Sequence, residues 1–273
     1  MESLRFIATK FSIIKKGEKA MDLIPLKLSV TTCYLIKTDE KYLLIDTGYE
    51  EDWELFQRRL KEVNVKFSQI GYLLLTHHHD DHCGLLNAIL QENNTICVVM
   101  SDLCNELIQK GENDLTHGGG LLNKRVAFLI RHKQAYVSIV LHKKVDKSKN
   151  LKFQPYSCRD IDILFKGEPK LRDIGIPLDG KILKTPGHTV DSISILFQDG
   201  DCLVGDAAAH MLSFAGTHYC VIFICNMEEY YHSWEKMIMA GTKRILPAHG
   251  LPFSVDKLVG NMRKNKSENL VLN

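Results

Sequence analysis

The sequence lacks several features that would assign a protein to a class at once. None of its eight cysteines forms a Cys-x-x-Cys pair, and several lie in apolar runs, where a free thiol behaves as a small hydrophobic side chain. No stretch approaches the roughly 20 apolar residues that span a membrane. The N-terminal MESLRFIATKF has no apolar core of the length found in signal peptides. We therefore expect a cytoplasmic protein with reduced thiols and no membrane partner.

The sequence also has little excess charge of either sign. Its 35 Lys and Arg residues against 33 Asp and Glu residues give a formal net charge of +2. Proteins that bind nucleic acids usually have a strong basic excess or a basic stripe. The one basic cluster, within 124–149, is typical of a solvated face followed by a charged loop. The composition thus favours a small-molecule substrate over a nucleic acid as the partner.

The sequence is long enough, and has enough apolar residues, for one domain with its own core. We take this domain to be 1–273. Of the 273 residues, 45% are apolar, so a core can form without disulfides. Apolar alternation and short apolar runs predict strands at 4–11, 30–36, 42–45, 70–75, 95–100, 160–165, 181–185, 192–197, 202–204 and 244–246. Helical periodicity predicts helices at 52–63, 83–91, 101–110 and 226–240, capped in the last two by Ser101 and Asn226, and Ser254 can cap a final helix.

The character of the chain changes between 112 and 154. Three consecutive glycines, 118–120, indicate a hinge, 121–141 has helical periodicity, and a charged loop follows. We interpret 112–154 as a helical insertion within the single domain. Three roles are open to it: a lid, a wall of a substrate pocket, or a contact between two copies in a homodimer.

The chemistry is concentrated in 76–84, Thr-His-His-His-Asp-Asp-His-Cys-Gly. It contains the pattern H-x-H-x-D-H at His77, His79, Asp81 and His82, in a predicted loop that follows a buried strand. Zinc is bound by imidazole nitrogen and carboxylate oxygen at about 2.0–2.2 Å. Without a metal, burying this much polarity would leave several ring nitrogens in need of partners. The segment therefore predicts a metal site.

Three further candidate ligands each follow a predicted strand. His188 lies in Thr-Pro-Gly-His-Thr, Asp206 in Gly-Asp, and His249 in Pro-Ala-His-Gly. Side chains that follow neighbouring strands converge on one sheet edge, as ligands of a shared site must. Asp46, in Asp-Thr-Gly, also follows a strand, and a simple turn residue is the alternative interpretation for it.

Taken together and in this order, these motifs resemble the metallo-β-lactamase fold superfamily. The resemblance runs from about Leu4 to the final helix, apart from the insertion. It implies an α/β fold, a four-layer αββα sandwich with the metals at one edge of the two sheets. It assigns His77, His79 and His188 to a first zinc, Asp81, His82 and His249 to a second, and Asp206 to a bridging position between them. Asp46 would support the metal loops from behind the ligands.

The resemblance further implies a dinuclear metallo-hydrolase with two Zn²⁺, iron and manganese being the alternative metals. A zinc-bridging hydroxide would attack an ester, thioester or lactone bond. Asp81 would act as the catalytic residue that takes a proton from the attacking water. The residues that bind the substrate remain unassigned, because specificity depends on loops and on the insertion.

Other members of the superfamily narrow the expected activity. Asp206 stands where the best-known class B lactamases have a cysteine, and Ala209 where quorum-quenching lactonases have a tyrosine. The chain after His249 is short for the helical domain of glyoxalase II. Two alternatives remain open: a phosphodiesterase or nuclease, and an iron-dependent oxidoreductase of the same fold. His79 favours zinc over diiron, because diiron flavoproteins carry a glutamate at that position. A metal-bound scaffold without turnover is a further alternative.

Overall fold

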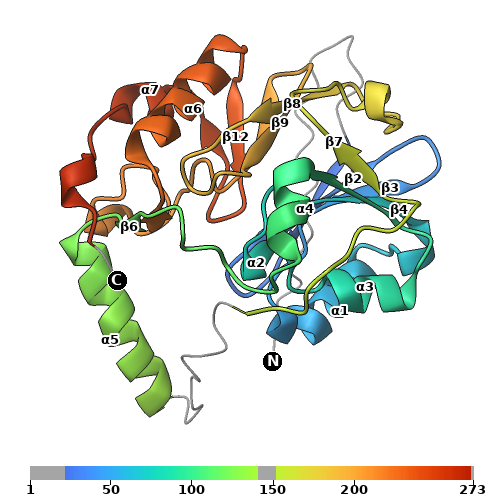
Figure 1. Cartoon of the computed structure of the whole chain (residues 1–273), viewed down its shortest axis with the longest axis horizontal. Coiled ribbons are helices and arrows are strands. Elements are labelled where there is room, and N and C mark those ends of the chain that lie inside the picture. Colours follow the sequence, from blue (N-terminus) through green and yellow to red (C-terminus); the bar gives the residue numbers. More distant parts are fainter. Residues whose placement is uncertain (1–21, 141–151, 272–273) are drawn as a thin grey trace, which may run out of the picture.

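The computed structural model describes residues 22–140 and 152–271, with side chains up to 132 in the first range, so the predicted strand at 4–11 lies outside the described residues. Two β-sheets lie face to face, and helices cover their outer sides (Figure 1). The first sheet has the order β1-β2-β3-β4-β5-β7. Its strands are β1 (Leu23–Lys27), β2 (Thr32–Lys37), β3 (Tyr42–Ile45), β4 (Ile70–Leu74), β5 (Cys97–Ser101) and β7 (Ile163–Phe165). β1 to β3 pair antiparallel, and β3, β4, β5 and β7 pair parallel.

The second sheet has the order β13-β12-β10-β9-β8. Its strands are β8 (Gly180–Lys184), β9 (Ile193–Phe197), β10 (Asp201–Gly205), β12 (Arg244–Pro247) and β13 (Phe253–Ser254). β10 and β12 pair parallel and the other neighbours antiparallel. A small separate sheet joins β6 (Gly120–Leu121) to β11 (Phe223–Ile224).

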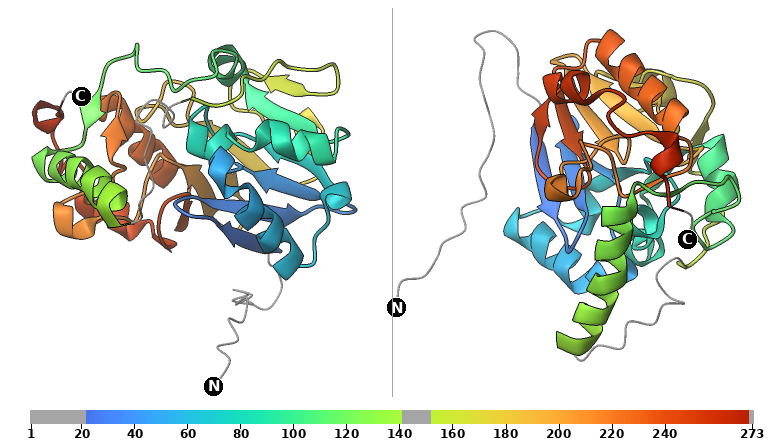
Figure 2. Two further views of the ribbon diagram at one scale, coloured as in Figure 1. Left: turned by 90° about the horizontal axis from the view of Figure 1, so that it is seen from below. Right: turned by 90° about the vertical axis from the view of Figure 1, so that its left-hand side faces the viewer.

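The helices are α1 (Trp53–Glu62), α2 (Asp80–Cys83), α3 (Leu86–Glu92), α4 (Asp102–Ile108), α5 (Lys124–Val140), α6 (Met227–Met239) and α7 (Asp256–Asn261). Short 3-10 turns lie at Glu50–Asp52, Phe67–Gln69, Arg172–Ile174, Ser213–Ala215 and Ser267–Asn269. Figures 1 and 2 show α1 and α6 on opposite sides of the pair of sheets. Within the described ranges, no helix has both the length and the apolar character that a membrane crossing requires.

Three hydrophobic clusters separate the four layers. In β2, Cys33 and Leu35 belong to the cluster beneath the helices of the first sheet, whereas Tyr34 and Ile36 belong to the cluster between the two sheets. This division follows from the period of two in a strand, which sends alternate side chains to opposite faces. The third cluster lies beneath α6 and contains Tyr230, with Trp234 and Met237. The predicted four-layer αββα sandwich is therefore confirmed.

Most predicted elements are present, with differences at particular places. Ser101 and Asn226 are the caps of α4 and α6, because their side chains accept hydrogen bonds from backbone N–H groups of the first turn. The prediction of a loop over 77–82 was wrong at its end, since Asp80–Cys83 forms one helical turn. The predicted helix 83–91 starts later, at Leu86. Ser254 ends β13, and Val255 occupies the cap position of α7.

The predicted insertion 112–154 begins and ends at the same place in the fold. Glu112 pairs with Lys152 in an isolated antiparallel bridge. The segment that follows Glu112 runs to β6, and α5 projects from the body of the molecule beyond it (Figure 1; Figure 2, right). Its predicted roles as a lid, a pocket wall or a dimer contact stay predictions.

Candidate metal centre

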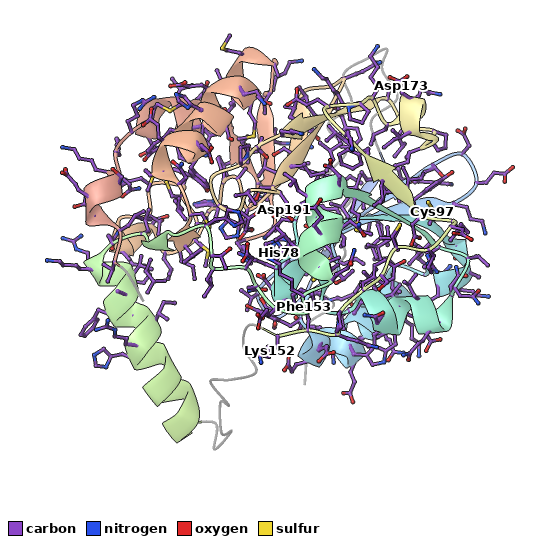
Figure 3. The ribbon with its side chains drawn as sticks, in the orientation of Figure 1. His78, Cys97, Lys152, Phe153, Asp173 and Asp191 are labelled. Atoms are coloured by element: carbon purple, nitrogen blue, oxygen red, sulfur yellow. The ribbon has the colours of Figure 1, made fainter. Side chains whose placement is uncertain are left out.

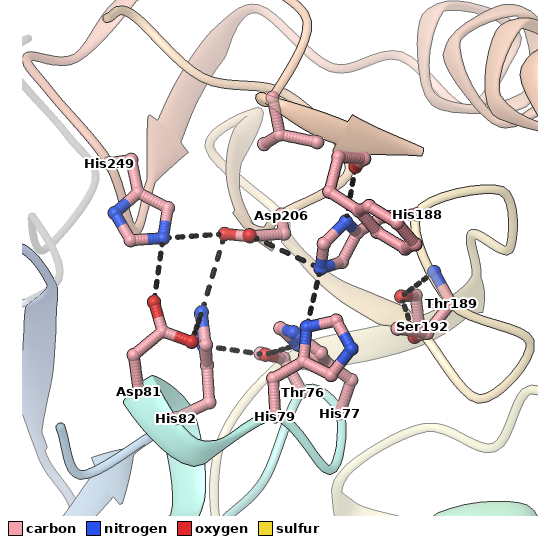
Figure 4. A network of polar contacts seen from close by, with 12 residues as sticks. Thr76, His77, His79, Asp81, His82, His188, Thr189, Ser192, Asp206 and His249 are labelled. Carbon is pink, nitrogen blue, oxygen red and sulfur yellow. Dashed lines mark hydrogen bonds and ion pairs between the residues drawn. The ribbon is translucent and has the colours of Figure 1, made fainter. Parts of the chain in front are cut away.

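The fold brings all seven predicted metal ligands to one edge of the two sheets. His77, His79, Asp81 and His82 follow β4, and the other three follow strands of the second sheet: His188 after β8, Asp206 after β10 and His249 after β12. The sheets are joined at this edge, where the Ile193 N–H donates to the Thr76 carbonyl (3.0 Å). Figure 3 shows the side chains on the whole ribbon and Figure 4 shows the cluster from close by.

The Asp206 carboxylate lies in the middle of the cluster. Its Oδ2 is 3.3 Å from His188 Nε2, whereas its Oδ1 is 3.3 Å from His82 Nε2 and 3.2 Å from His249 Nε2 (Figure 4). The two oxygens of one side chain therefore face two different sets of imidazoles. This is the arrangement that a carboxylate shared by two cations requires.

Acceptors behind three of the histidines determine which ring nitrogen carries the proton. His188 Nδ1 lies 2.8 Å from the Phe223 carbonyl, and His249 Nδ1 lies 3.1 Å from the Val30 carbonyl. His82 Nδ1 lies 2.8 Å from an oxygen of Asp46. Because carbonyl and carboxylate oxygens only accept, each of these Nδ1 atoms donates, and in the neutral ring Nε2 has a free lone pair.

The lone pairs of His82 and His249 point at carboxylate oxygens, which is unfavourable unless a positive charge lies between them, whereas His188 Nε2 lies 2.9 Å from His79 Nδ1 and 3.3 Å from Asp206 Oδ2. His249 Nε2, for example, is 3.1 Å from Asp81 Oδ2. Four of the buried atoms that have no hydrogen-bond partner among the described residues belong to this cluster: Nε2 of His77, of His79 and of His82, and Oδ1 of Asp206. Unpartnered buried polar atoms are costly. Bound divalent cations would satisfy both the nitrogens and the carboxylates, so the residues present fit a metal centre.

The donor atoms fall into three overlapping groups whose members lie within 4.8 Å of one another. The groups are His77, His79 and His188; His77, His82 and Asp206; and Asp81, His82 and His249. The first and third groups have no residue in common, and Asp206 touches both of them. The cluster therefore offers two separate groups of donors, with nitrogen and oxygen atoms of the kind that zinc prefers.

Burial keeps one set of histidines neutral. Desolvation lowers the pKa of His77, of His79 and of His188, because burial away from water disfavours the imidazolium. A neutral imidazole is the form that binds a metal ion.

The carboxylates act in the opposite direction on the remaining two histidines. Burial also opposes a charge on His249, but Asp206 and Asp81 outweigh it and raise the pKa of His249 to about 10. The pKa of His82 is raised in the same way, against burial, mainly by Asp81 and by Asp46. The carboxylates of the cluster thus favour positive charge beside them, which protons supply in the metal-free chain and metal ions can supply instead.

Asp46 supports this arrangement from behind. Its Oδ1 accepts from the Thr76 N–H and its Oδ2 from the Thr76 hydroxyl, both at 2.8 Å, and Oδ2 also accepts from His82 Nδ1. Asp46 has φ +59°, in the left-handed region, where Asp and Asn are the most tolerated residues apart from glycine. The interpretation of Asp46 as a mere turn residue is therefore wrong, because its carboxylate holds both the end of β4 and a ring of the cluster.

Two residues that the sequence did not predict are affected by or contact the carboxylates of the cluster: Tyr49 and Thr31. The half-buried Tyr49 follows the Asp-Thr-Gly motif, and its pKa is raised by burial and by the carboxylates Asp81, Asp80 and Asp206. Thr31 Oγ1 lies 3.4 Å from Asp81 Oδ2 and can donate to it. Tyr49 follows a recognised motif directly, which is a signal that could have been used. Thr31 has no local signal, because only the fold brings it to Asp81.

Fold and donor set together define an αββα protein with a buried cluster of metal-binding side chains. The family model of the metallo-beta-lactamase superfamily matches residues 26–249, and the chain belongs to this superfamily. The family resemblance seen in the motifs is thus confirmed.

Curated relatives agree with this assignment. A protein named Beta-lactamase-like protein 2 homolog from Caenorhabditis elegans is 24% identical over 241 residues, 86% of this chain and 60% of that protein. The protein of the same name from Drosophila melanogaster is 23% identical over 232 residues, which are 82% of this chain and 59% of that protein. The Probable metallo-hydrolase YqjP of Bacillus subtilis is 41% identical over 70 residues, 25% of this chain and 22% of that protein. The chain thus spans about 60% of the length of the first two.

Solved structures share the fold. A metallo-beta-lactamase family protein from Thermus thermophilus superposes with a TM-score of 0.57 at 16% identity, covering 89% of this chain and 79% of that one. An archaeal protein of the superfamily, from Sulfolobus tokodaii, superposes with a TM-score of 0.52 at 19% identity, covering 86% of this chain and 80% of that one. At these identities the likeness concerns the fold alone.

Proposed function

We propose that the chain is a dinuclear zinc hydrolase that acts on an ester, thioester or lactone bond. The observation that carries the proposal is the position of Asp206, whose two carboxylate oxygens face separate groups of imidazole nitrogens. The metal-hydrolase name of the Bacillus subtilis relative supports the same reaction class.

The donors divide between two ions as follows. His77, His79 and His188 would hold the first ion, and Asp81, His82 and His249 the second, with Asp206 shared. Two divalent ions at this spot would supply Lewis acidity toward a carbonyl oxygen and would acidify water. The hydrogen bonds at Nδ1 of His82, of His188 and of His249 orient these rings before an ion arrives, which reduces the cost of binding it.

Asp81 is our candidate for the residue that accepts a proton. Its Oδ2 lies 3.4 Å from the Thr31 hydroxyl, which can donate to it, and 3.1 Å from His249 Nε2. Its side chain is 13% exposed, against 7% for Asp206, which leaves Asp81 the more accessible of the two carboxylates. We assign to Asp81 the acceptance of a proton, at a carboxylate oxygen, from the water that attacks the substrate.

The test compares wild-type protein with Asp206→Ala on five substrate classes: ester, thioester, lactone, β-lactam and phosphodiester. We expect the zinc-loaded wild type to hydrolyse one of the first three, and Asp206→Ala to lose about 100-fold or more of that activity. Asp201→Ala is the matched control, because Asp201 lies at the other end of β10, where it pairs with Arg244. Its turnover should equal that of the wild type.

Two outcomes contradict the proposal. Turnover by Asp206→Ala that equals the wild type, in a folded protein, removes Asp206 from the site. Turnover of phosphodiesters only replaces the proposed substrate class by the phosphodiesterase alternative.

A further inference from the structure

His78 stands between two candidate ligands, yet its ring has partners of its own. The side chain is 1% exposed, and Nδ1 lies 2.9 Å from Asp191 Oδ1. The other oxygen of Asp191 accepts from the backbone N–H of His78 at 3.0 Å. One fully buried carboxylate therefore holds both the ring and the main chain of this residue. Figure 3 labels both side chains, near the middle of the view where the two halves of the molecule meet.

The second ring nitrogen of His78 is also occupied. Its Nε2 accepts from the backbone N–H of Asp114 at 2.9 Å. Because a backbone N–H can only donate, Nε2 must offer a lone pair, and the proton of the neutral ring lies on Nδ1, where it is donated to Asp191. Both nitrogens are thus used within the protein, which makes His78 unavailable as a metal ligand.

The side chains of His77 and His79 point to one side of the segment and that of His78 to the other. His77 and His79 belong to the candidate metal cluster, whereas the ring of His78 contacts Asp191 and the Asp114 amide. Fixing the ring of His78 therefore also fixes the direction of its two neighbours.

The partners of His78 come from segments that carry or contact the other ligand of the first group. Asp191 lies three residues after His188, in the same connection between β8 and β9. Asp114 precedes β6, which pairs with β11, and Phe223 of β11 is the acceptor for His188 Nδ1. Contacts of one buried ring therefore connect the segments that hold His77, His79 and His188.

A second pair reinforces the same connection. The Asp80 N–H donates to Asn113 Oδ1 at 2.9 Å, and Asn113 Nδ2 donates to Asp80 Oδ1 at 2.8 Å. The start of the predicted insertion is thereby attached both to His78 and to the first residue of α2. This attachment places 113–114 directly behind the metal-binding segment.

We propose that His78 is a positioning residue that clamps the segment 77–79 between Asp191 and the Asp114 amide, so that His77, His79 and His188 face one metal ion. This inference rests on the proposed function, since it requires that these three side chains bind a metal. It assigns no contact with substrate to His78.

The test is a titration of metal-free protein with Co²⁺, in which visible absorption bands report the ligand geometry and competition with a chelator reports the affinity. We expect His78→Leu to weaken the binding of one of the two ions by about 10- to 100-fold and to alter its bands. His78→Asn should recover part of the affinity, because its amide N–H can reach Asp191. Asp191→Asn should weaken the binding of the same ion. Asp191 accepts hydrogen bonds from two N–H groups, and the amide of Asn has only one oxygen to accept them.

The matched control is Asp162→Asn. Asp162 is as buried as Asp191, with 0% side-chain exposure, and it also accepts from a backbone N–H, that of Val98, at 3.0 Å. It lies outside the candidate metal cluster, so its variant should keep the wild-type Co²⁺ affinity and spectrum while losing stability.

The possible results separate the two proposals. Wild-type protein that binds no Co²⁺ overturns the proposed function and this inference with it. Wild-type protein that binds two ions, with unchanged affinity and spectrum in folded His78→Leu and Asp191→Asn, overturns the positioning role alone. If His78→Leu does not fold by circular dichroism, His78→Asn and Asp191→Asn decide in the same way.

Discussion

At the residue scale, the same side chain has different roles according to the atoms around it. His77 and His79 have buried ring nitrogens with no partner among the described residues, whereas both nitrogens of the adjacent His78 are hydrogen bonded. The ring of His78 therefore faces away from the candidate metal cluster. Asp46 differs from the candidate ligands in a similar way. It accepts three hydrogen bonds, two from Thr76 and one from His82, and so orients these residues without being a candidate ligand itself.

Asp46→Asn tests the role of that carboxylate with little change of shape. Asn tolerates the positive φ at this position, and its oxygen can still accept from the Thr76 N–H. The new amide N–H₂ would face His82 Nδ1–H, two donors opposed. We expect zinc affinity to fall about 10- to 100-fold, with a small change in melting temperature.

Chelator competition measures the affinity and thermal unfolding measures the stability. Asp46→Ala should additionally lose stability, because alanine disfavours the left-handed conformation. Equal zinc affinity in Asp46→Asn and the wild type would show that the carboxylate is dispensable.

At the scale of elements, the sequence predicted those strands and helices that have a clear alternation or helical period of their own. The alternation in β2 and the periodicity of α6 were sufficient for both elements. β1 was missed because it contains Pro25, and proline is admitted only at the edge of a sheet, which the sequence does not reveal. α2 was missed because four residues are too few to show a helical period. β6 and β11 have two residues each and exist through their pairing across the chain.

The pairing of β6 with β11 matters because β11 holds the acceptor for His188. Gly119 precedes β6, and a Cβ there would lie 2.4 Å from the Ile224 carbonyl oxygen. We expect Gly119→Ala to separate the two strands, to lower the melting temperature and to weaken binding of the first metal ion.

Gly118→Ala is the matched control. Gly118 also has a positive φ, +80° against +95° for Gly119, but a Cβ there would meet nothing within 4 Å. Both variants carry the backbone strain of about 1–2 kcal/mol, and only Gly119→Ala adds the clash. If both variants lost the same amount of metal affinity, the affinity would not depend on the pairing of β6 with β11.

At the scale of the whole molecule, the candidate metal cluster forms only where the edges of the two sheets come together. Four of the seven candidate ligands follow a strand of the first sheet and three follow strands of the second. Contacts such as the hydrogen bond from the Thr32 N–H to the Ala248 carbonyl, at 2.8 Å, hold the two edges together. A chain that does not close this sandwich cannot assemble the cluster.

This dependence explains how much of the site was predictable. The candidate ligands were found because each lies in a short motif at the end of a strand, and the order of the motifs resembles a known superfamily. Asp191 and Thr31 were not found, because their contacts join residues 113 and 50 positions apart. Such contacts follow from the packing of the sheets and leave no local trace in the sequence.

If the seven clustered side chains hold two zinc ions, the purified protein should contain them. The measurement is elemental analysis of protein purified without added metal. We expect close to two zinc ions per chain in the wild type and a clear loss of zinc in Asp206→Ala. One iron ion per chain without zinc would contradict a dinuclear zinc centre and would favour the oxidoreductase alternative.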